Sequence, residues 1–376
     1  MIARGRRIGL TEHNKGSKDS DFVRRAVSAI AADLRRSADT HLVRLRLPCL
    51  PGVSIYLKDE STHPSGSLKH RLARSLFLYG LCNGWIRSDT TIVEASSGST
   101  AISEAYFAQL IGLPFVAVVP DTTANEKIAA IKFCGGACHL VPGIAIYDEA
   151  KRLANQLGGH YMDQFTYAER ATDWRSNNNI AESIFAQMAL EQHSLPSWII
   201  VSAGTGGTSS TIGRYIRYDP DLCGRTRVLV VDPERSVFRD YWRTGDRNLI
   251  SLQPSRIEGI GRPRVEPSFL RDVVDDVITV PDAASIATIH WLEDVLGRKC
   301  GGSTGTNLWG TLQIAAAMHA RGETGSLVTL ICDSGERYRT SYYNPEWIAG
   351  HDLNPTPWRA ALDEFSLSGR LVSPSG

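Results

Sequence analysis

The feature that most constrains the fold is a series of short, β-branched, almost entirely apolar runs that alternate with helix-like segments. The clearest of these runs are residues 90–95, 114–119, 198–202, 228–231 and 327–332. Strands of this kind are typical of parallel sheets whose two faces are both covered by helices. The alternation therefore predicts a doubly wound α/β architecture, in which ligands bind at the carboxyl ends of the strands.

Helical and strand periodicity extend the same pattern toward the N-terminus. Helices are predicted at 19–36, 67–81, 100–110 and 126–133, and further strands at 53–58 and 138–141. The polar stretch 163–179 separates one round of alternation from the next. We therefore expect two doubly wound domains with a cleft between them.

Composition argues against several classes of protein. Lys and Arg number 41 and Asp and Glu 40, so the net charge of +1 provides no general attraction for nucleic acid or an anionic membrane surface. The apolar runs are far shorter than the roughly 20 residues of a membrane helix, and the basic N-terminus lacks the apolar stretch of a secretory signal. Seven scattered cysteines form neither a disulfide framework nor a zinc-site pattern. We expect a cytoplasmic protein without a bound metal.

A glycine-rich loop follows the apolar run 198–202 and opens directly into a helix. Its sequence is Ala203-Gly-Thr-Gly-Gly-Thr-Ser-Ser210. Glycines let the backbone turn its amides inward, and a helix N-terminus adds donors and a positive dipole end, so the loop predicts a phosphate cradle. It is also nearly a dinucleotide fingerprint, with Ser209 in place of the third glycine and Asp232 as a ribose-binding acid. A plain strand-to-helix turn is the simplest alternative.

The loop Ser96-Ser-Gly-Ser-Thr100 lies between another predicted strand and helix. Hydroxyls and amides at the start of a helix can bind a carboxylate or a phosphate. Ser and Thr are also the preferred residues for capping a helix N-terminus, so a purely structural role stays open here.

Lys69 follows the turn Pro64-Ser-Gly-Ser67 at the start of a predicted helix. A lysine cation at the positive end of a helix is electrostatically disfavoured. An amine that loses its charge easily suits Schiff-base chemistry, so Lys69 is a candidate nucleophile.

Four motifs stand in the order seen in pyridoxal-phosphate enzymes of the cysteine synthase/cystathionine β-synthase family, which have fold type II (tryptophan synthase β-like). They are Pro-Ser-Gly-Ser-Leu-Lys69, the 96–100 loop, Gly204-Thr-Gly-Gly-Thr208 and Asp333-Ser-Gly-Glu-Arg-Tyr338. The resemblance extends from about Asp19 to about Glu364. Segments 62–64, 67–85 and 257–264 resemble most closely the L-cysteine desulfhydrases of that family.

The resemblance implies a role for each motif around bound pyridoxal 5'-phosphate. Lys69 would bind the cofactor covalently and act as the base at the substrate Cα, and Ser334 would hydrogen-bond the pyridine nitrogen. The cofactor-binding residues would be Lys69, Ser99, Gly204, Thr205, Gly206, Gly207, Thr208 and Ser334. The substrate-binding residues would be Ser96, Ser97, Gly98, Ser99, Thr100, Gln164 and Glu258.

The same resemblance implies the domain boundaries and the assembly. Residues 63–170 would form a smaller, mobile domain with the substrate loop, and residues 1–62 and 171–376 a larger domain that binds the cofactor phosphate. The partners would be a small amino-acid substrate and a second copy of the chain in a homodimer.

The chain departs from the family pattern at three positions. The substrate loop commonly reads Ser-Gly-Asn-Thr, and Ser99 stands in place of the asparagine that contacts the ring oxygen of the cofactor. A hydroxyl is shorter and donates only one hydrogen, so the hold on the cofactor is expected to differ. His63 replaces an asparagine before the turn, and His70 follows the lysine. For both histidines we favour a packing or solvated role.

The implied reaction follows from the partner of the pyridine nitrogen. A serine, unlike an aspartate, does not keep that nitrogen protonated, so Ser334 favours loss of a β-substituent over transamination. The desulfhydrase resemblance implies β-elimination of L-cysteine to sulfide, ammonia and pyruvate through an aminoacrylate. A β-replacement enzyme of the cysteine synthase or cystathionine β-synthase type is the alternative. A nicotinamide dehydrogenase would leave Lys69 and Ser334 unexplained.

Overall fold

A computed structural model describes the backbone of residues 10–374 and the side chains of residues 18–143 and 145–374. The chain divides into two compact units. The first unit comprises Met1–Ala38, Leu76–Ser97 and Ala101–Met162, and the second comprises Asp39–Ser75, Gly98–Thr100 and Asp163–Gly376.

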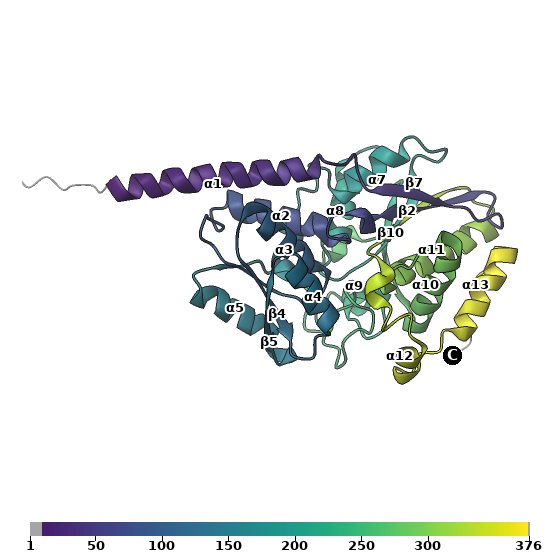
Figure 1. Cartoon of the computed structure of the whole chain (residues 1–376). Coiled ribbons are helices and arrows are strands. Elements are labelled where there is room, and N and C mark those ends of the chain that lie inside the picture. The colour runs from purple at the N-terminus through teal and green to yellow at the C-terminus, as the bar shows by residue number, and fades with distance from the viewer. Residues whose placement is uncertain (1–9, 375–376) are drawn as a thin grey trace, which may run out of the picture. The chain divides into compact units, whose positions relative to one another are not determined.

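The second unit is built on a six-stranded sheet (Figure 1). Its strands, in spatial order, are β1 (His41–Leu45), β2 (Val53–Asp59), β10 (Gly325–Ile331), β7 (Pro196–Ser202), β8 (Arg227–Pro233) and β9 (Asp276–Val280). All neighbouring strands are parallel except β1 and β2. The parallel strands therefore end at one edge, where their following loops meet.

Helices cover both faces of this sheet, which explains why its strands are apolar at successive positions. Ile200 and Leu229 pack into one core with Trp309 and Leu312, whereas their neighbours Val201 and Val230 pack into a second core on the opposite face. When both faces of a strand are buried, its residues are apolar at successive positions and do not alternate with polar ones.

Among the helices of the second unit, α10, α11 and α13 pack beside one another, and α11 lies against β10, β7 and β2 (Figure 1). The unit contains α6 (Gln164–Ala171), α7 (Ile180–Met188), α8 (Gly207–Tyr218), α9 (Phe238–Thr244), α10 (Asp282–Leu296), α11 (Gly302–Ala320), α12 (Pro345–Gly350) and α13 (Thr356–Ser368).

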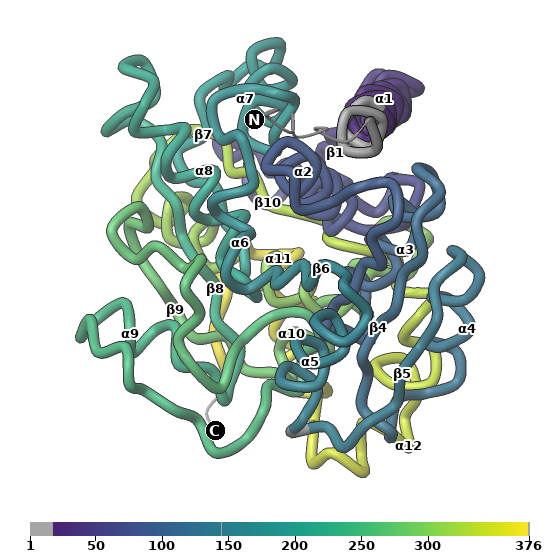
Figure 2. Tube along the Cα trace, turned by 90° about the vertical axis from the view of Figure 1, so that its left-hand side faces the viewer, coloured from purple at the N-terminus to yellow at the C-terminus, as the bar shows by residue number. Residues whose placement is uncertain are grey.

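The first unit has a smaller, fully parallel sheet. Its strands, in order, are β5 (Ala137–Val141), β4 (Phe115–Pro120), β3 (Ile92–Ala95) and β6 (His160–Tyr161), and Figure 2 shows β4 and β5 side by side. Helices α1 (Leu10–Leu34), α4 (Asn125–Phe133) and α5 (Ile146–Gln156) belong to this unit, and α5 packs on β3 and β4. Helices α2 (Lys69–Cys82) and α3 (Ser99–Ile111) have their N-terminal residues in the second unit and the rest in the first.

The predicted α/β class is confirmed. Every predicted strand is present within one or two residues, whereas the helix predicted at 19–36 already begins at Leu10 and the one predicted at 67–81 begins at Lys69. No helix within residues 10–374 has the length and apolar character needed to cross a membrane. All seven cysteines are free thiols. The described side chains include no group of three or more His, Cys, Asp or Glu placed to hold a metal ion.

Candidate active site

The glycine-rich loop connects β7 to the N-terminus of α8. Gly206 is the residue before the helix and has a positive φ of 89°. The Gly207 amide donates to Thr205 Oγ1 (3.2 Å), which fixes the turn. Amides in the first turn of a helix lack carbonyl acceptors within that helix, so the start of α8 presents donors at the sheet edge.

The loop glycines also permit very close packing. A Cβ on Gly204 would lie 2.1 Å from the Gly259 carbonyl oxygen, and one on Gly206 would lie 2.4 Å from Phe269 Cα. The Gly261 amide donates to the Ala203 carbonyl oxygen (2.8 Å). The segment that contains Glu258 is thereby held against the glycine-rich loop.

The lysine turn lies beside the end of β10. The Leu68 amide donates to the Cys332 carbonyl oxygen (2.8 Å), and Ser67 forms an isolated β-bridge with Asp333. Lys69 is the first residue of α2. Ser334 follows Asp333 directly, so the backbone pairing brings the turn before Lys69 and the loop with Ser334 together, although they are far apart in sequence.

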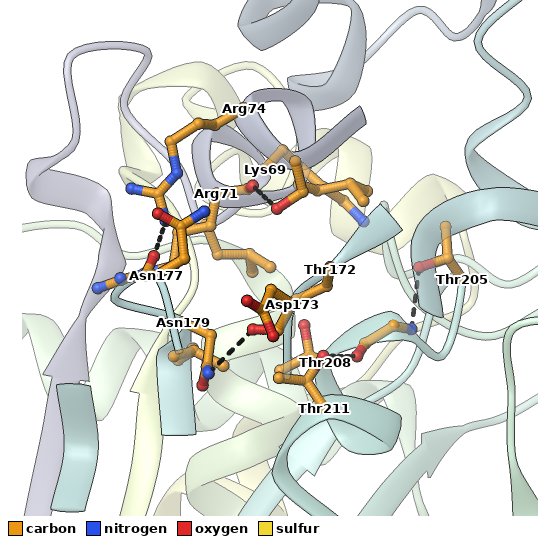
Figure 3. Close-up of a pocket in the computed structure, with 15 residues that line it drawn as sticks. Lys69, Arg71, Arg74, Thr172, Asp173, Asn177, Asn179, Thr205, Thr208 and Thr211 are labelled. Atoms are coloured by element: carbon orange, nitrogen blue, oxygen red, sulfur yellow. Dashed lines mark hydrogen bonds between the residues drawn. The ribbon is translucent and has the colours of Figure 1, made fainter. Parts of the chain in front are cut away.

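Lys69 and the glycine-rich loop line one pocket. Figure 3 shows Lys69, Arg71 and Arg74 from α2 on one side of it, and Thr205, Thr208 and Thr211 from the loop and α8 on the other. The candidate Schiff-base lysine and the candidate phosphate cradle therefore line the same pocket. Asp173, Asn177 and Asn179, which the sequence analysis did not select, complete its polar rim.

A buried ionic network anchors the start of α2. Arg71 donates to Glu60 Oε2 (2.7 Å), to Asp39 Oδ1 (3.0 Å) and to the Asn178 carbonyl oxygen (2.7 Å). Burial alone would raise the pKa of Glu60, but the charge and hydrogen bonds of Arg71 hold it well below its usual value. Because Arg71 lies two residues after Lys69, this network fixes the helix turn from which the lysine projects.

The two histidines near the lysine pack on one another. The His63 and His70 rings stack with their centroids 4.9 Å apart. His63 Nε2 lies 3.0 Å from Glu60 Oε2, and His70 Nδ1 lies 3.1 Å from Ser65 Oγ. These contacts give both histidines a packing role that shapes the lysine turn.

Thr100 and Ser99 of the 96–100 loop make side-chain hydrogen bonds within the second unit. Thr100 Oγ1 donates to Gln164 Oε1 (2.8 Å), which joins two predicted substrate-binding residues. Arg337 Nη1 donates to Ser99 Oγ (2.7 Å). Ser96 and Ser97 belong to the first unit and are connected to these residues through the chain itself. Ser96, Ser97, Gly98 and Ser99 are partly exposed, as a ligand-binding loop requires.

Glu258 lies in an exposed loop whose backbone is held by Tyr342. The Glu258 amide donates to the Tyr342 hydroxyl (2.7 Å), which in turn donates to the Arg256 carbonyl oxygen (3.0 Å). Burial raises the pKa of Asp333 to about 6 and the charge of Glu258 adds to this shift, while the Tyr338 hydroxyl and Arg337 oppose it. The charge of Glu258 therefore acts on Asp333, the residue directly before Ser334.

Asp232 is not placed to bind a ribose. It is 1% exposed, and its Oδ2 accepts a hydrogen bond from the Arg239 amide (3.0 Å) in the first turn of α9. Burial raises the pKa of Asp232 to about 7. A buried carboxyl group of this kind does not reach the ribose of a dinucleotide. Of the two features that suggested a dehydrogenase, only the glycine-rich loop is left.

A family model described as "Pyridoxal-phosphate dependent enzyme" matches residues 36–333 of the chain. The chain belongs to this family. Its cofactor is accordingly pyridoxal phosphate, and the resemblance seen in the sequence motifs is confirmed.

Named relatives of this pyridoxal-phosphate enzyme cover most of its length. L-cysteine desulfhydrase Cds1 of Mycobacterium tuberculosis is 59% identical over 350 residues, which are 92% of this chain and 94% of that protein. Cysteine synthase 1 of Neurospora crassa is 26% identical and covers 84% of each chain. The crystal structure of O-ureido-L-serine synthase superposes with a TM-score of 0.71 at 28% identity, over 85% of this chain and 96% of that one.

The residues of this pyridoxal-phosphate enzyme fit its cofactor. Thr205, Gly207 and Thr208 line the same pocket as Lys69, so an anion cradle and an amine face one cavity. Neighbouring backbone occupies the space that side chains at Gly204 and Gly206 would need. The loop amides therefore stay at the sheet edge. Lys69 would hold the cofactor aldehyde, the 204–208 loop its phosphate and Ser334 its pyridine nitrogen.

No sequence motif indicated a role for Arg337 or Tyr342, which hold the loops that contain Ser99 and Glu258. Arg337 lies inside the quoted motif 333–338, so its position was visible although its contact was not. Tyr342 follows that motif, and no sequence signal distinguishes it from an ordinary core aromatic.

Proposed function

We propose that this enzyme is an L-cysteine desulfhydrase, which converts L-cysteine and water to pyruvate, sulfide and ammonia. The observation that carries the proposal is the 59% identity to L-cysteine desulfhydrase Cds1 over 92% of the chain. The pocket shared by Lys69 and the glycine-rich loop supports it, because a lysine amine and an anion cradle are what the family chemistry needs in one place. The cofactor, when bound, withdraws electrons from the substrate Cα.

In this proposal the chain's own residues divide the work of elimination. The amides and hydroxyls of the 96–100 loop, with Gln164 beside Thr100, bind the substrate carboxylate. The Lys69 amine removes the Cα proton, which lets the electron pair expel the thiolate from Cβ. Ser334 would hydrogen-bond the cofactor ring nitrogen without keeping that nitrogen protonated. Glu258 would face the β-substituent.

A β-replacement enzyme is the second candidate. It is favoured by the relatives whose printed names are cysteine synthase and O-ureido-L-serine synthase. The two reactions share the loss of the β-substituent and differ only in whether a second nucleophile then adds to Cβ.

The experiment is to incubate the purified holoenzyme with L-cysteine alone and to measure pyruvate and sulfide together. We expect one pyruvate for each sulfide, because elimination releases both from the same molecule. Lys69→Ala is expected to abolish turnover and to remove the visible absorption of the covalently held cofactor. Sulfide released with a thioether product and without pyruvate would establish replacement instead, and normal turnover by the Lys69 variant would refute its role.

We also propose the domain boundaries, the assembly and the location that the resemblance implies. In this proposal the smaller, mobile substrate-loop domain spans residues 63–170 and the larger domain residues 1–62 and 171–376, whereas the compact units assign Met1–Ala38 to the smaller unit and Asp39–Ser75 to the larger. The enzyme is a homodimer in the cytoplasm. Light scattering on the purified holoenzyme would measure the mass of the assembly, and a monomer mass would refute the dimer.

A further inference from the structure

Arg337 joins two loops that the proposed reaction uses. Its guanidinium donates from Nη1 to Ser99 Oγ (2.7 Å) and from Nη2 to the Ser65 carbonyl oxygen (2.9 Å). Ser99 belongs to the loop assigned to the substrate carboxylate, and Ser65 belongs to the turn that leads to Lys69. One side chain therefore sets the separation between the carboxylate loop and the lysine turn.

The surroundings of Arg337 are shaped around its guanidinium. Gly66 has a φ of +73°, and a Cβ at that position would lie 3.0 Å from Nη2. The base of the side chain is held as well, since the Tyr338 hydroxyl donates to Asp333 (2.7 Å) and the Gly335 amide donates to the Lys299 carbonyl oxygen (3.0 Å). A planar, two-pronged donor on a rigid segment gives a defined geometry that a flexible ammonium group cannot reproduce.

The contact at Ser99 also orients that hydroxyl. A guanidinium can only donate, so Ser99 Oγ accepts in this bond, and the hydroxyl hydrogen points toward a different acceptor. Ser99 stands where relatives in the resembling family commonly have an asparagine, a longer side chain with two donors.

We propose that Arg337 is a positioning residue, which holds Ser99 against the lysine turn and so sets where the substrate carboxylate binds relative to Lys69. This inference rests on the proposed role of the 96–100 loop. It assigns Arg337 to substrate binding, since the glycine-rich loop that cradles the cofactor phosphate makes none of these contacts.

The test uses L-alanine, which has the amino and carboxylate groups of the substrate but no leaving group. Its dissociation constant for the holoenzyme can be measured from the change in the visible absorption of the cofactor. Because L-alanine undergoes neither elimination nor replacement, its binding does not depend on which reaction the enzyme performs. A failure of the desulfhydrase proposal and a failure of this one are thus separate results.

We expect Arg337→Met and Ser99→Ala each to raise that dissociation constant about tenfold, the loss typical of one hydrogen bond to a charged group. The double variant should lose less affinity than the two single losses added together, because both changes remove the shared contact between Arg337 and Ser99. Arg337→Lys should fall between Arg337→Met and the wild type. Arg339→Met is the matched control, because Arg339 is exposed and pairs with Glu336 on the same short helical turn.

A second readout uses the apoprotein. Amide hydrogen exchange of residues 97–100 should be faster in Arg337→Met and Ser99→Ala than in the wild type or Arg339→Met, because the loop loses its anchor. If Arg337→Met does not fold, Arg337→Lys provides the test, since a flexible ammonium group cannot reproduce both contacts of the guanidinium. Unchanged L-alanine binding in Arg337→Met, or strictly additive effects in the double variant, would each overturn the proposal.

Discussion

Buried carboxyl groups in this protein differ in pKa according to whether a cation lies beside them. Glu60 is fully buried, yet the Arg71 guanidinium holds its pKa well below the usual value. Asp232 is equally buried, and there burial raises the pKa to about 7 against the hydrogen bonds from Ser236 and Arg239. Asp232 therefore takes up a proton in the folded protein at a pH where the unfolded chain has lost it.

This difference predicts a pH dependence for stability that Asp232→Asn removes. Between about pH 4 and pH 7 the folded wild type binds a proton at Asp232 that the unfolded chain releases, so its free energy of unfolding falls as the pH rises. An amide has no such titration. Urea unfolding of the apoprotein at pH 5 and pH 8 measures this, and the free energy of unfolding of the wild type relative to the variant should be lower at pH 8 than at pH 5 by at most about 3 kcal/mol. Asp272→Asn, a change at an exposed carboxyl group, should show the same pH dependence of stability as the wild type. The same pH dependence in Asp232→Asn would refute the raised pKa of Asp232.

The glycine-rich loop depends on both an unusual backbone conformation and a lack of space. Gly206 has a φ of 89°, which an L-residue adopts only at a cost of roughly 1–2 kcal/mol. A Cβ there would also lie 2.4 Å from Phe269 Cα. The loop amides and the start of α8 can hold an anion only while this turn is kept.

We expect Gly206→Ala to weaken pyridoxal-phosphate binding at least tenfold, because the turn must open to relieve the clash with Phe269. Gly224→Ala is the matched control: Gly224 has a φ of +75°, but a Cβ there meets nothing within 4 Å. It should lose about 1 kcal/mol of stability and no cofactor affinity. Equilibrium dialysis of the two apoproteins against the cofactor measures the difference. Equal affinities would mean that the loop does not bind the phosphate.

On the scale of the whole molecule, segments distant in sequence meet in the network around Arg71. Asp39 precedes the sheet, Glu60 follows β2, and Asn178 lies beside α7, and all three bond to this one arginine. Burying such charges is costly, and the network is stable only while every member keeps its partner. It ties the start of α2 to the core of the second unit.

Arg71→Met should therefore leave the buried Glu60 carboxylate without its arginine, and the half-buried Asp39 with Lys58 as its remaining cation. We expect this to lower the free energy of unfolding by about 3–5 kcal/mol. Arg152→Met removes an arginine from an exposed ion pair with Glu149 and should leave the stability unchanged. Urea unfolding of both apoproteins near neutral pH compares them. A loss at Arg71 no larger than that at Arg152 would show that the network contributes nothing.

The sequence by itself determined the elements and the chemistry at their ends. Each apolar run and each glycine turn is a local signal, because the strand period and the left-handed backbone of residues such as Gly206 depend only on nearby residues. That is why the strands, the glycine-rich loop and Lys69 at the start of a helix were predicted correctly. The start of α1 at Leu10 was missed, because the apolar periodicity that signals a buried helix face begins only further along the chain.

Only the tertiary structure decided which of these elements are neighbours. The pairing of β10 with β2 and β7 brings Ser334 beside the lysine turn, and it joins strands that are more than a hundred residues apart in the chain. The contact of Arg337 with Ser99 depends on that pairing. Strand order and long-range side-chain contacts are selected by the packing free energy of the assembled core, for which no single segment contains a signal.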